Sequence, residues 1–362
     1  MTDRIRTAFI GLNPQSHWAA SAHMPALRAL SDRFDVVGVA NSSAESARRS
    51  AEAFRLPHAF ADADALIESS EVDLVVVTVK VPHHFDLVSK AIAAGKHVYC
   101  EWPLGNGLAE AEALARLAED AGIVAAVGTQ ARVAPEILHL GRLIADGYVG
   151  DVLSTTIVAD GNAWGPQATS DYAYLYDASN GATMLTIPIG HTLAGVRDVL
   201  GEVGAVDARF AVRRPDIMIT DTSERLTATS PDDVIVMGAL ESGATLSIHY
   251  RGGRSLVTGL LWEICGTEGD IRVTGANGHT QLVDLSLHGA RGDATELEPL
   301  VPPADAYAGL PEGAVARNVA ALYSRIAEDI RTGSRTAPSF ADAVGLHRVI
   351  DRIEQAAADG GA

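Results

Sequence analysis

Residues 7–13 read Thr-Ala-Phe-Ile-Gly-Leu-Asn, a short apolar run that stops at a glycine and leads into a turn. Such a run is typical of a buried strand, and a helical stretch follows it near residues 23–30. The same alternation of strand and helix recurs through the first third of the chain. It predicts a parallel sheet wrapped by helices, the doubly wound α/β fold.

The pattern changes after the first third. We expect the early strands at Thr7–Ile10, Val36–Val39, Leu74–Val79, His97–Cys100 and Ile123–Val127, and a connecting helix at Pro135–Asp146. From Asp151–Ala159 to Asp270–Thr274, longer strands succeed one another, which predicts a C-terminal α+β domain with a large, mostly antiparallel sheet. We place the domains at residues 1–128 and 129–362, and the last helix is predicted to pack back on the first domain.

Composition narrows the possible functions. The 362 residues include 28 Lys and Arg against 46 Asp and Glu, a net charge of −18, which would repel nucleic acid and anionic membranes. Two cysteines are too few for a disulfide framework and indicate a reduced compartment. No apolar run is long enough to span a bilayer, so we expect a soluble, cytoplasmic protein.

The turn after the first strand is a candidate phosphate-binding turn. Gly11 stands where a dinucleotide fold needs its first glycine, and Asn13 stands at the second position, where Asn tolerates positive φ. Leu12 lies between them. An ordinary strand-to-helix loop is the alternative interpretation.

The end of the second strand offers no carboxylate for a ribose 2′-hydroxyl. Asn41 and Ser42 stand there instead, followed by Ser43, with Arg48 and Arg49 farther along. These residues could accept a 2′-phosphate, so NADP is favoured over NAD. A serine that caps the next helix is an equally acceptable reading, and both roles can coexist.

Two further segments carry a family resemblance. Residues 79–84 read Val-Lys-Val-Pro-His-His, and residues 94–104 read Ala-Gly-Lys-His-Val-Tyr-Cys-Glu-Trp-Pro-Leu. Together with the turn, they resemble the glucose-fructose oxidoreductase and inositol dehydrogenase family (Gfo/Idh/MocA), in particular the branch of the fungal galactose-regulon repressor. The resemblance implies a Rossmann domain that binds NAD or NADP. The positions that it adds to the cofactor site are Val79, Lys80, His84, Glu101, Trp102 and Gln130.

The chain departs from that family at two ionisable positions. Family enzymes usually carry Glu-Lys-Pro and Asp-x-x-x-His, whereas this chain has Trp102 for the Lys and Ile187 for the Asp. An indole donates one hydrogen bond and delivers no proton near pH 7. His191 remains, and we expect it to titrate in the useful range and to handle the proton that accompanies hydride transfer. A buried structural histidine is the alternative.

Other candidates flank this histidine in the predicted substrate site. Tyr172, Tyr174 and Tyr176 are spaced by two, which predicts three rings on one face of a strand, with Tyr176 as a second proton donor. Arg132 would bind an anionic group or form a salt bridge between domains, and Trp164 would be a lid or loop packing. Asp177 and Asn180 complete the substrate set with Trp102, and no metal site is expected.

Two functions remain open. The first is an NAD(P)-dependent oxidoreductase that moves a hydride between nicotinamide and a carbonyl or alcohol carbon of a sugar, cyclitol or related ketone. The second is a non-catalytic NAD(P)-binding regulatory or scaffold protein. By resemblance, a homodimer or homotetramer formed through the C-terminal sheet is expected in either case.

Overall fold

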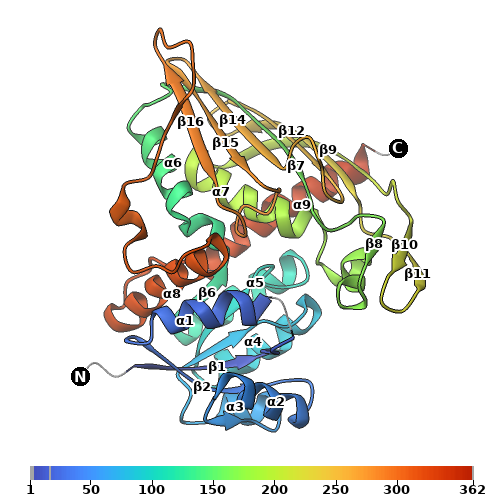
Figure 1. Cartoon of the computed structure of the whole chain (residues 1–362), viewed down its shortest axis with the longest axis vertical. Coiled ribbons are helices and arrows are strands. Elements are labelled where there is room, and N and C mark those ends of the chain that lie inside the picture. The colour runs from blue at the N-terminus through green and yellow to red at the C-terminus, as the bar shows by residue number, and fades with distance from the viewer. Residues whose placement is uncertain (1–3, 16–17, 361–362) are drawn as a thin grey trace. The chain divides into compact units, whose positions relative to one another are not determined.

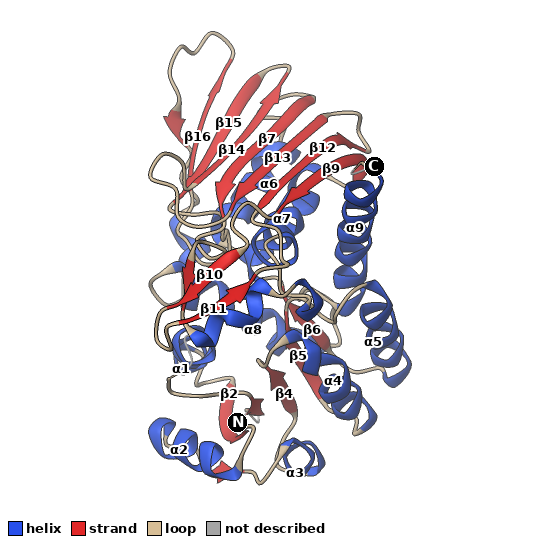
Figure 2. Ribbon diagram, turned by 90° about the vertical axis from the view of Figure 1, so that its right-hand side faces the viewer, coloured by secondary structure: helices blue, strands red, loops and turns tan. Residues whose placement is uncertain are grey.

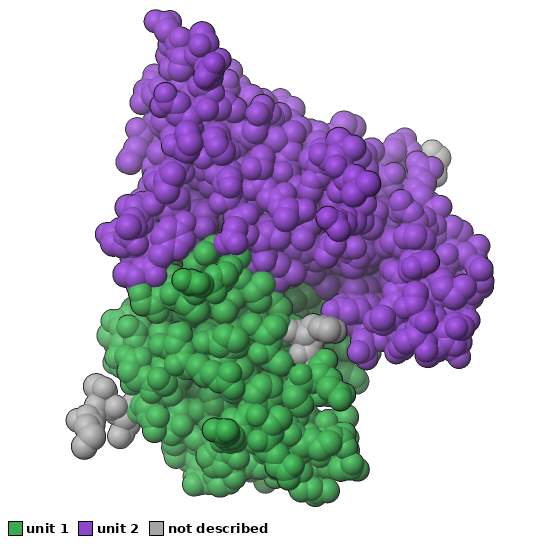
Figure 3. All heavy atoms as spheres, viewed as in Figure 1, with its two compact units in different colours: residues 1–130, 309–347 green, residues 131–308, 348–362 purple. Residues whose placement is uncertain are grey.

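A computed structural model describes residues 4–15 and 18–360 and divides the chain into two compact units. Unit 1 comprises Met1–Gln130 and Gly309–His347, and unit 2 comprises Ala131–Ala308 and Arg348–Ala362 (Figure 3). The chain thus returns to unit 1 after unit 2 and then ends in unit 2. A domain boundary at residue 128 stays a prediction.

Unit 1 is built on a six-stranded parallel sheet in the order β3-β2-β1-β4-β5-β6 (Figure 1). Thr7 of β1 pairs with Leu74 of β4, so the strand order reverses between these two strands. Such a reversal opens the crevice in which doubly wound sheets bind ligands. The predicted α/β fold is confirmed. The strands are β1 (Ile5–Ile10), β2 (Phe34–Ala40), β3 (His58–Ala59), β4 (Leu74–Val77), β5 (His97–Glu101) and β6 (Ala125–Gly128).

Helices cover this sheet, which explains why β4 is a continuous apolar run with every residue buried. α4 packs beside α5, and α1 packs beside α8. Gly122 ends α5 in the left-handed conformation, which glycine adopts readily. The helices of unit 1 are α1 (Met24–Ala29), α2 (Ala44–Phe54), α3 (Ala63–Glu68), α4 (His84–Ala93), α5 (Leu108–Ala121), α8 (Ala314–Thr332) and the first part of α9 (Phe340–Asp359).

Unit 2 contains an eight-stranded sheet in the order β17-β16-β15-β14-β7-β13-β12-β9 (Figure 2). Only the pair β7–β13 is parallel among these neighbours, so the predicted, mostly antiparallel sheet is confirmed. Its strands are β7 (Val152–Asp160), β9 (Val203–Ala211), β12 (Asp233–Leu240), β13 (Thr245–Arg251), β14 (Leu260–Gly266), β15 (Gly269–Gly275), β16 (Ser286–Arg291) and β17 (Glu298–Pro299). A smaller sheet joins β8 (Gln167–Ala168), β10 (Asp216–Ile219) and β11 (Glu224–Thr227).

Two helices of unit 2, α6 (Pro135–Ala145) and α7 (Gly190–Leu200), pack against each other. Along β13, Ile248 and Tyr250 are buried, whereas the alternate residues Ser247 and His249 are partly exposed. Thr192 of α7 bonds to Tyr250, so this helix contacts the buried face. Met237 of β12, which pairs with Ser247, lies on the other face and is 55% exposed.

One expectation about this unit was wrong, and α7 at Gly190–Leu200 was not among the predicted elements. The tyrosines 172, 174 and 176 do not lie on a strand but in a 3-10 helix, Ser170–Tyr176. With three residues per turn, positions two apart point in different directions. Tyr172 is accordingly exposed and Tyr176 buried.

No helix within residues 4–15 and 18–360 has the length and apolar character needed to cross a membrane.

Candidate functional site

The turn after β1 is shaped by Gly11. This residue has φ +107°, and a Cβ atom added to it would lie 2.7 Å from Cγ1 of Val79, so only glycine fits. Asn13 does not use the positive φ that the sequence suggested. Instead, its side-chain oxygen accepts a hydrogen bond from the amide of Gln15 at 2.9 Å. Residues 16–17 of the turn lie outside the described residues.

Asn41 fastens this turn to the end of β2. Its side-chain nitrogen donates to the carbonyl of Leu12 at 2.8 Å and also reaches the hydroxyls of Ser46 and Ser50. Ser43 caps α2 by accepting from the amide of Ser46, as the helix-cap interpretation predicts. The hydroxyl of the exposed Ser42 makes no hydrogen bond within the described part of the chain.

His84 ties the loop after β4 to the loop after β5. Its Nε2 lies 2.9 Å from the carbonyl oxygen of Val79, and its Nδ1 lies 2.8 Å from that of Pro103. A carbonyl only accepts, so both bonds form together only on a protonated ring. Burial lowers the pKa of His84, so one of the two bonds is made at neutral pH. Lys80, one position after Val79, is exposed.

A buried polar network surrounds Glu101 at the end of β5. One carboxylate oxygen lies 3.0 Å from Nε2 of His23 and 2.9 Å from Nε2 of Gln130. The same Gln130 nitrogen donates to the hydroxyl of Tyr99, and Nδ1 of His23 lies 2.8 Å from the hydroxyl of Tyr323 on α8. His23 closes a π-helical turn, Ala19–His23, directly after the glycine turn. None of His23, Tyr99 and Tyr323 was expected in the site: Tyr99 lies in the 94–104 segment without an assigned role, and no motif contains the other two.

Trp102 follows Glu101, is buried, and is joined to Pro103 by a cis peptide bond. Its indole lies against the imidazole of His347 in α9, with ring centroids 4.6 Å apart. Burial lowers the pKa of His347 to about 4, so this ring is neutral at pH 7. Trp102 thus stands at the position of the family Lys, and it packs against a neutral ring so that the pair carries no charge.

In unit 2, His191 lies at the start of α7 and is 4% exposed. Its Nδ1 is buried and has no hydrogen-bond partner in the described residues. Burial, and to a lesser extent the neighbouring His279, lowers the pKa of His191 to about 3. The expectation that this imidazole titrates near neutral pH is thus not met, because the ring is buried and a second imidazole, His279, opposes its protonation.

The other predicted substrate residues of unit 2 serve local structure. The hydroxyl of Tyr176 donates to the carbonyl of Gly165 at 3.1 Å, so its proton would have to leave this bond to reach a substrate. Trp164 donates from its indole nitrogen to Leu175. Asp177 accepts from the amide of Ser179, and Asn180 donates to the carbonyl of Tyr174.

Arg132 forms a two-pronged ion pair with Asp198 of α7. Its Nε lies 2.6 Å from one carboxylate oxygen and its Nη2 lies 2.9 Å from the other. Both residues belong to unit 2, so this salt bridge lies within one unit and not between two.

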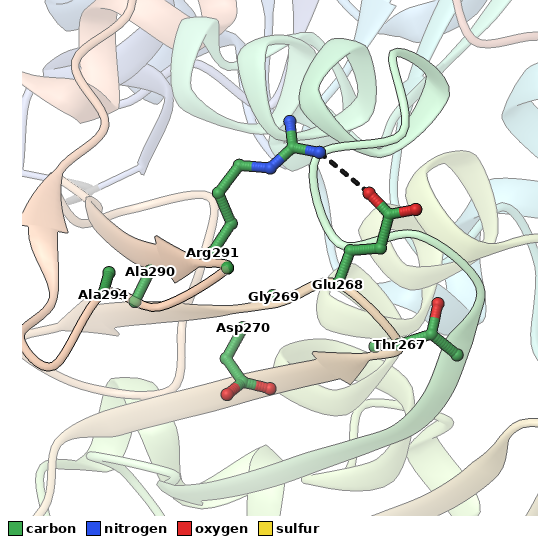
Figure 4. A pocket seen from close by; sticks show the side chains of 9 residues that line it. Thr267, Glu268, Gly269, Asp270, Ala290, Arg291 and Ala294 are labelled. Carbon is green, nitrogen blue, oxygen red and sulfur yellow. Dashed lines mark hydrogen bonds and ion pairs between the residues drawn. The ribbon is translucent and has the colours of Figure 1, made fainter.

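An open hollow of about 500 Å³ lies in unit 2, at the turn between β14 and β15. Figure 4 shows its paired charges, Arg291 and Glu268, which are 2.9 Å apart, and the carboxylate of Asp270 nearby. None of the residues predicted from the sequence lines this hollow.

The comparisons place the chain in a family. Residues 5–129 match the model of the oxidoreductase family with an NAD-binding Rossmann fold, GFO_IDH_MocA, and residues 135–275 match that of the Gal80p C-terminal domain. A dehydrogenase of Aspergillus oryzae, aclE, is 32% identical over 286 residues, which cover 76% of this chain and 78% of that protein. The chain belongs to the Gfo/Idh/MocA oxidoreductase family.

Among its relatives are the galactose/lactose metabolism regulatory proteins GAL80 of two yeasts. The Saccharomyces cerevisiae protein is 26% identical, covering 96% of this chain and 92% of that protein. The Kluyveromyces lactis protein is 28% identical over 306 residues, and the match covers 78% of this chain and 66% of that protein. The crystal structure of a super-repressor mutant of S. cerevisiae Gal80p shares the fold, with a TM-score of 0.89, 24% identity and coverage of 99% and 97% of the two chains.

Unit 1 fits the dinucleotide that this family fold implies. Gly11 allows the tight turn after β1, and Thr129 at the end of β6 has a buried hydroxyl oxygen with no hydrogen-bond partner among the described residues. Buried polar atoms without partners are rare in folded proteins, and a ligand can satisfy them. Gly11, Leu12, Asn13 and Asn41 are brought together in this unit, as are Glu101, Trp102 and Gln130.

Proposed function

We propose that the chain is an NAD(P)-dependent oxidoreductase that acts on an alcohol or carbonyl carbon of a small polar molecule, such as a sugar, a cyclitol or a related ketone. The family fold supports dinucleotide binding by unit 1. The observation that carries the catalytic part is the buried Nδ1 of His191 in unit 2, which has no hydrogen-bond partner among residues 4–15 and 18–360. A substrate oxygen would give this nitrogen the hydrogen bond that the fold does not supply.

The nicotinamide, when bound, supplies or accepts the hydride. The protein's part is then orientation and hydrogen bonding. His191 stays neutral at physiological pH, so it acts as a hydrogen-bond partner of the substrate oxygen, while water takes or returns the proton. A neutral imidazole can polarise a carbonyl in this way. Tyr176 is a secondary candidate because its proton is held by Gly165.

The test is direct. Binding of NAD and NADP is measured by calorimetry, and turnover is then measured in both directions with sugars, cyclitols and ketones. We expect His191→Ala to lower kcat about 100-fold or more, because the substrate oxygen loses a hydrogen bond, and to leave dinucleotide binding intact. Tyr176→Phe should change kcat much less. Absence of turnover with either cofactor across the panel would exclude this proposal.

We further propose a preference for NADP. β2 ends without a carboxylate, and the hydroxyl of the exposed Ser42 can donate a hydrogen bond to a 2′-phosphate. Ser42→Asp should weaken NADP binding by roughly tenfold through charge repulsion and spare NAD. Ser42→Ala is the matched control without the charge. Equal loss of both cofactors in the Asp variant would contradict the assignment.

A second function is favoured by a different observation. Trp102 and His347 form a neutral apolar pair where family enzymes usually carry a Lys, and the yeast GAL80 relatives are named as regulatory proteins. In that case the chain is a non-catalytic NAD(P)-binding regulator or scaffold. Affinity purification with and without dinucleotide tests it, and recovery of only the chain itself under both conditions would count against it.

We also propose a homodimer or homotetramer through the open face of the large sheet, in a reduced cytoplasmic setting. Both cysteines, Cys100 and Cys265, are free thiols. Met237 on the open face of β12 is 55% exposed, and apolar surface of this kind is typically covered by a partner. Light scattering should show a dimer or larger that Met237→Glu dissociates, whereas a monomeric wild-type chain would exclude the assembly.

A further inference from the structure

His279 lies in the loop after β15 and was not singled out by the sequence. Its ring is 8% exposed and lies nearly parallel to Trp164, at 13° and 6.3 Å between centroids. Its Nε2 lies 2.8 Å from the carbonyl oxygen of Gly161, and its Nδ1 lies 3.4 Å from the side-chain nitrogen of Gln281.

These partners fix the tautomer of His279. A carbonyl only accepts, so Nε2 carries the proton and donates to Gly161. Nδ1 then accepts from the amide of Gln281. Both ring nitrogens are occupied within the fold, so His279 has no nitrogen left for a substrate. His191 differs, because its Nδ1 is buried and unpartnered in the described chain.

The loop of His279 is also bonded to the helix start that carries His191. Tyr250 donates from its hydroxyl to the carbonyl of Gly278, and the hydroxyl of Thr192 lies 2.7 Å from the Tyr250 oxygen. Because the single Tyr250 proton goes to Gly278, Thr192 is the donor in the second bond. A Cβ atom at Gly278 would lie 2.5 Å from both Asp160 O and Tyr250 Cε1, so the loop approaches this closely only with glycine.

On its other side, His279 holds a strained loop. Asn162 and Trp164 both have positive φ, at 56° and 57°, a conformation that residues with side chains rarely adopt. Strained backbone of this kind persists where surrounding bonds enforce it, and it gathers at functional sites. The bond from His279 to Gly161 and the stacking on Trp164 are two such restraints.

We propose that His279 is a positioning residue of the substrate site: it joins the 161–165 loop to the start of α7 and so fixes where a substrate meets His191. This inference rests on the proposed function and names a further residue that determines its geometry. The charge of the site agrees with it. Burial and His279 oppose protonation of His191, while the carboxylate of Asp160 acts on His279 in the opposite sense.

The experiment compares His279→Phe, which keeps the ring but loses the bond to Gly161, with His279→Gln, whose amide can still donate. His139→Phe on α6 is the control. The ¹⁵N resonances of the His191 ring in the full chain report its tautomer and protonation without any need for turnover. We expect them to shift, with a raised pKa of His191, in His279→Phe and to stay at wild-type values in the control.

Turnover gives the second readout. Loss of positioning should lower kcat by about tenfold or more in His279→Phe with little change in KM, and His279→Gln should recover most of it. If the wild type turns over no substrate, the proposed function fails, yet the resonances still decide the role of His279. Unchanged His191 resonances in a folded His279→Phe chain would overturn the inference.

Should His279→Phe fail to fold, Gln281→Leu replaces it, because this change withdraws the hydrogen bond to Nδ1 and leaves His279 in place. The His191 resonances should then move in the same direction by a smaller amount. Wild-type resonances in a folded Gln281→Leu chain would overturn the inference.

Discussion

The indole of Trp102 lies against the imidazole of His347, with 4.6 Å between the ring centroids, at the position where relatives with a Glu-Lys-Pro sequence carry an ammonium group. Both rings are buried, and the pKa of His347 is lowered to about 4 by that burial. The local environment therefore favours a neutral pair and disfavours the charged Lys that relatives carry at position 102.

We expect Trp102→Lys to destabilise the chain by several kcal/mol, because an ammonium would be buried against a ring that resists charge. Trp102→Phe keeps an aromatic ring and should lose about 1 kcal/mol. Urea unfolding of the two variants measures the difference. Equal stability of the Lys and Phe variants would show that water or a carboxylate reaches position 102.

Gly11→Ala should abolish or strongly weaken dinucleotide binding. Its Cβ would lie 2.7 Å from Val79 in a backbone conformation that alanine adopts poorly. Gly95→Ala is the control, since Gly95 also has positive φ but has no atom within 4 Å of the added Cβ. Calorimetry should show at least a tenfold loss for Gly11→Ala and wild-type affinity for Gly95→Ala. The same affinity in both would contradict a role for the turn.

Stability should fall on acidification because buried neutral histidines resist protonation. The pKa values of His191 and His347 are lowered to about 3 and about 4, whereas in the unfolded chain they return to about 6.5. The unfolded state then binds more protons, so the free energy of unfolding decreases as pH drops below 6.5. By pH 5 each histidine contributes a loss of about 2 kcal/mol.

Urea unfolding at pH 7 and pH 5 measures this loss. His191→Gln and His347→Gln should each show a smaller pH dependence than the wild type, whereas exposed His83→Gln should match it. A pH dependence unchanged in both buried-site variants would mean that water reaches these rings.

The Glu101 network should behave as a unit. Glu101→Leu leaves His23 and Gln130 without their shared acceptor in a buried site, which we expect to destabilise the chain by about 1–3 kcal/mol. In the Glu101→Leu background, His23→Leu should lower the free energy of unfolding by less than it does in the wild type, because His23 has already lost its carboxylate partner. A double-mutant cycle in urea measures the coupling, and strictly additive losses would argue against it.

The sequence predicted the elements whose signals are local. The buried run at Leu74–Val77 and the cap at Ser43 each depend on residues within a few positions. α7 escaped prediction because Pro188, Gly190 and Gly195 interrupt its helical pattern. The tyrosine run was misassigned because an alternation over only five residues is too short to identify a strand.

The candidate site was predictable as single residues but not as contacts. Motif positions identified Gly11, Trp102 and His191. The contact partners of site residues lie far along the chain. His347 contacts Trp102, and Tyr323, which bonds to His23, lies 300 residues from it. Nothing in a single sequence marks such pairs. The low pKa of His191 follows from burial beside His279, so it too was invisible before the fold was known.

Strand β7 sits in the middle of its sheet, yet its neighbours come late: Ser154 pairs with Thr245 of β13 and with Cys265 of β14. A ribosome adding about 5–20 residues per second would release this strand several seconds or more before either neighbour emerges. The newborn chain therefore carries this unpaired strand during translation. A chaperone that shields the strand until its neighbours are made would help this protein most.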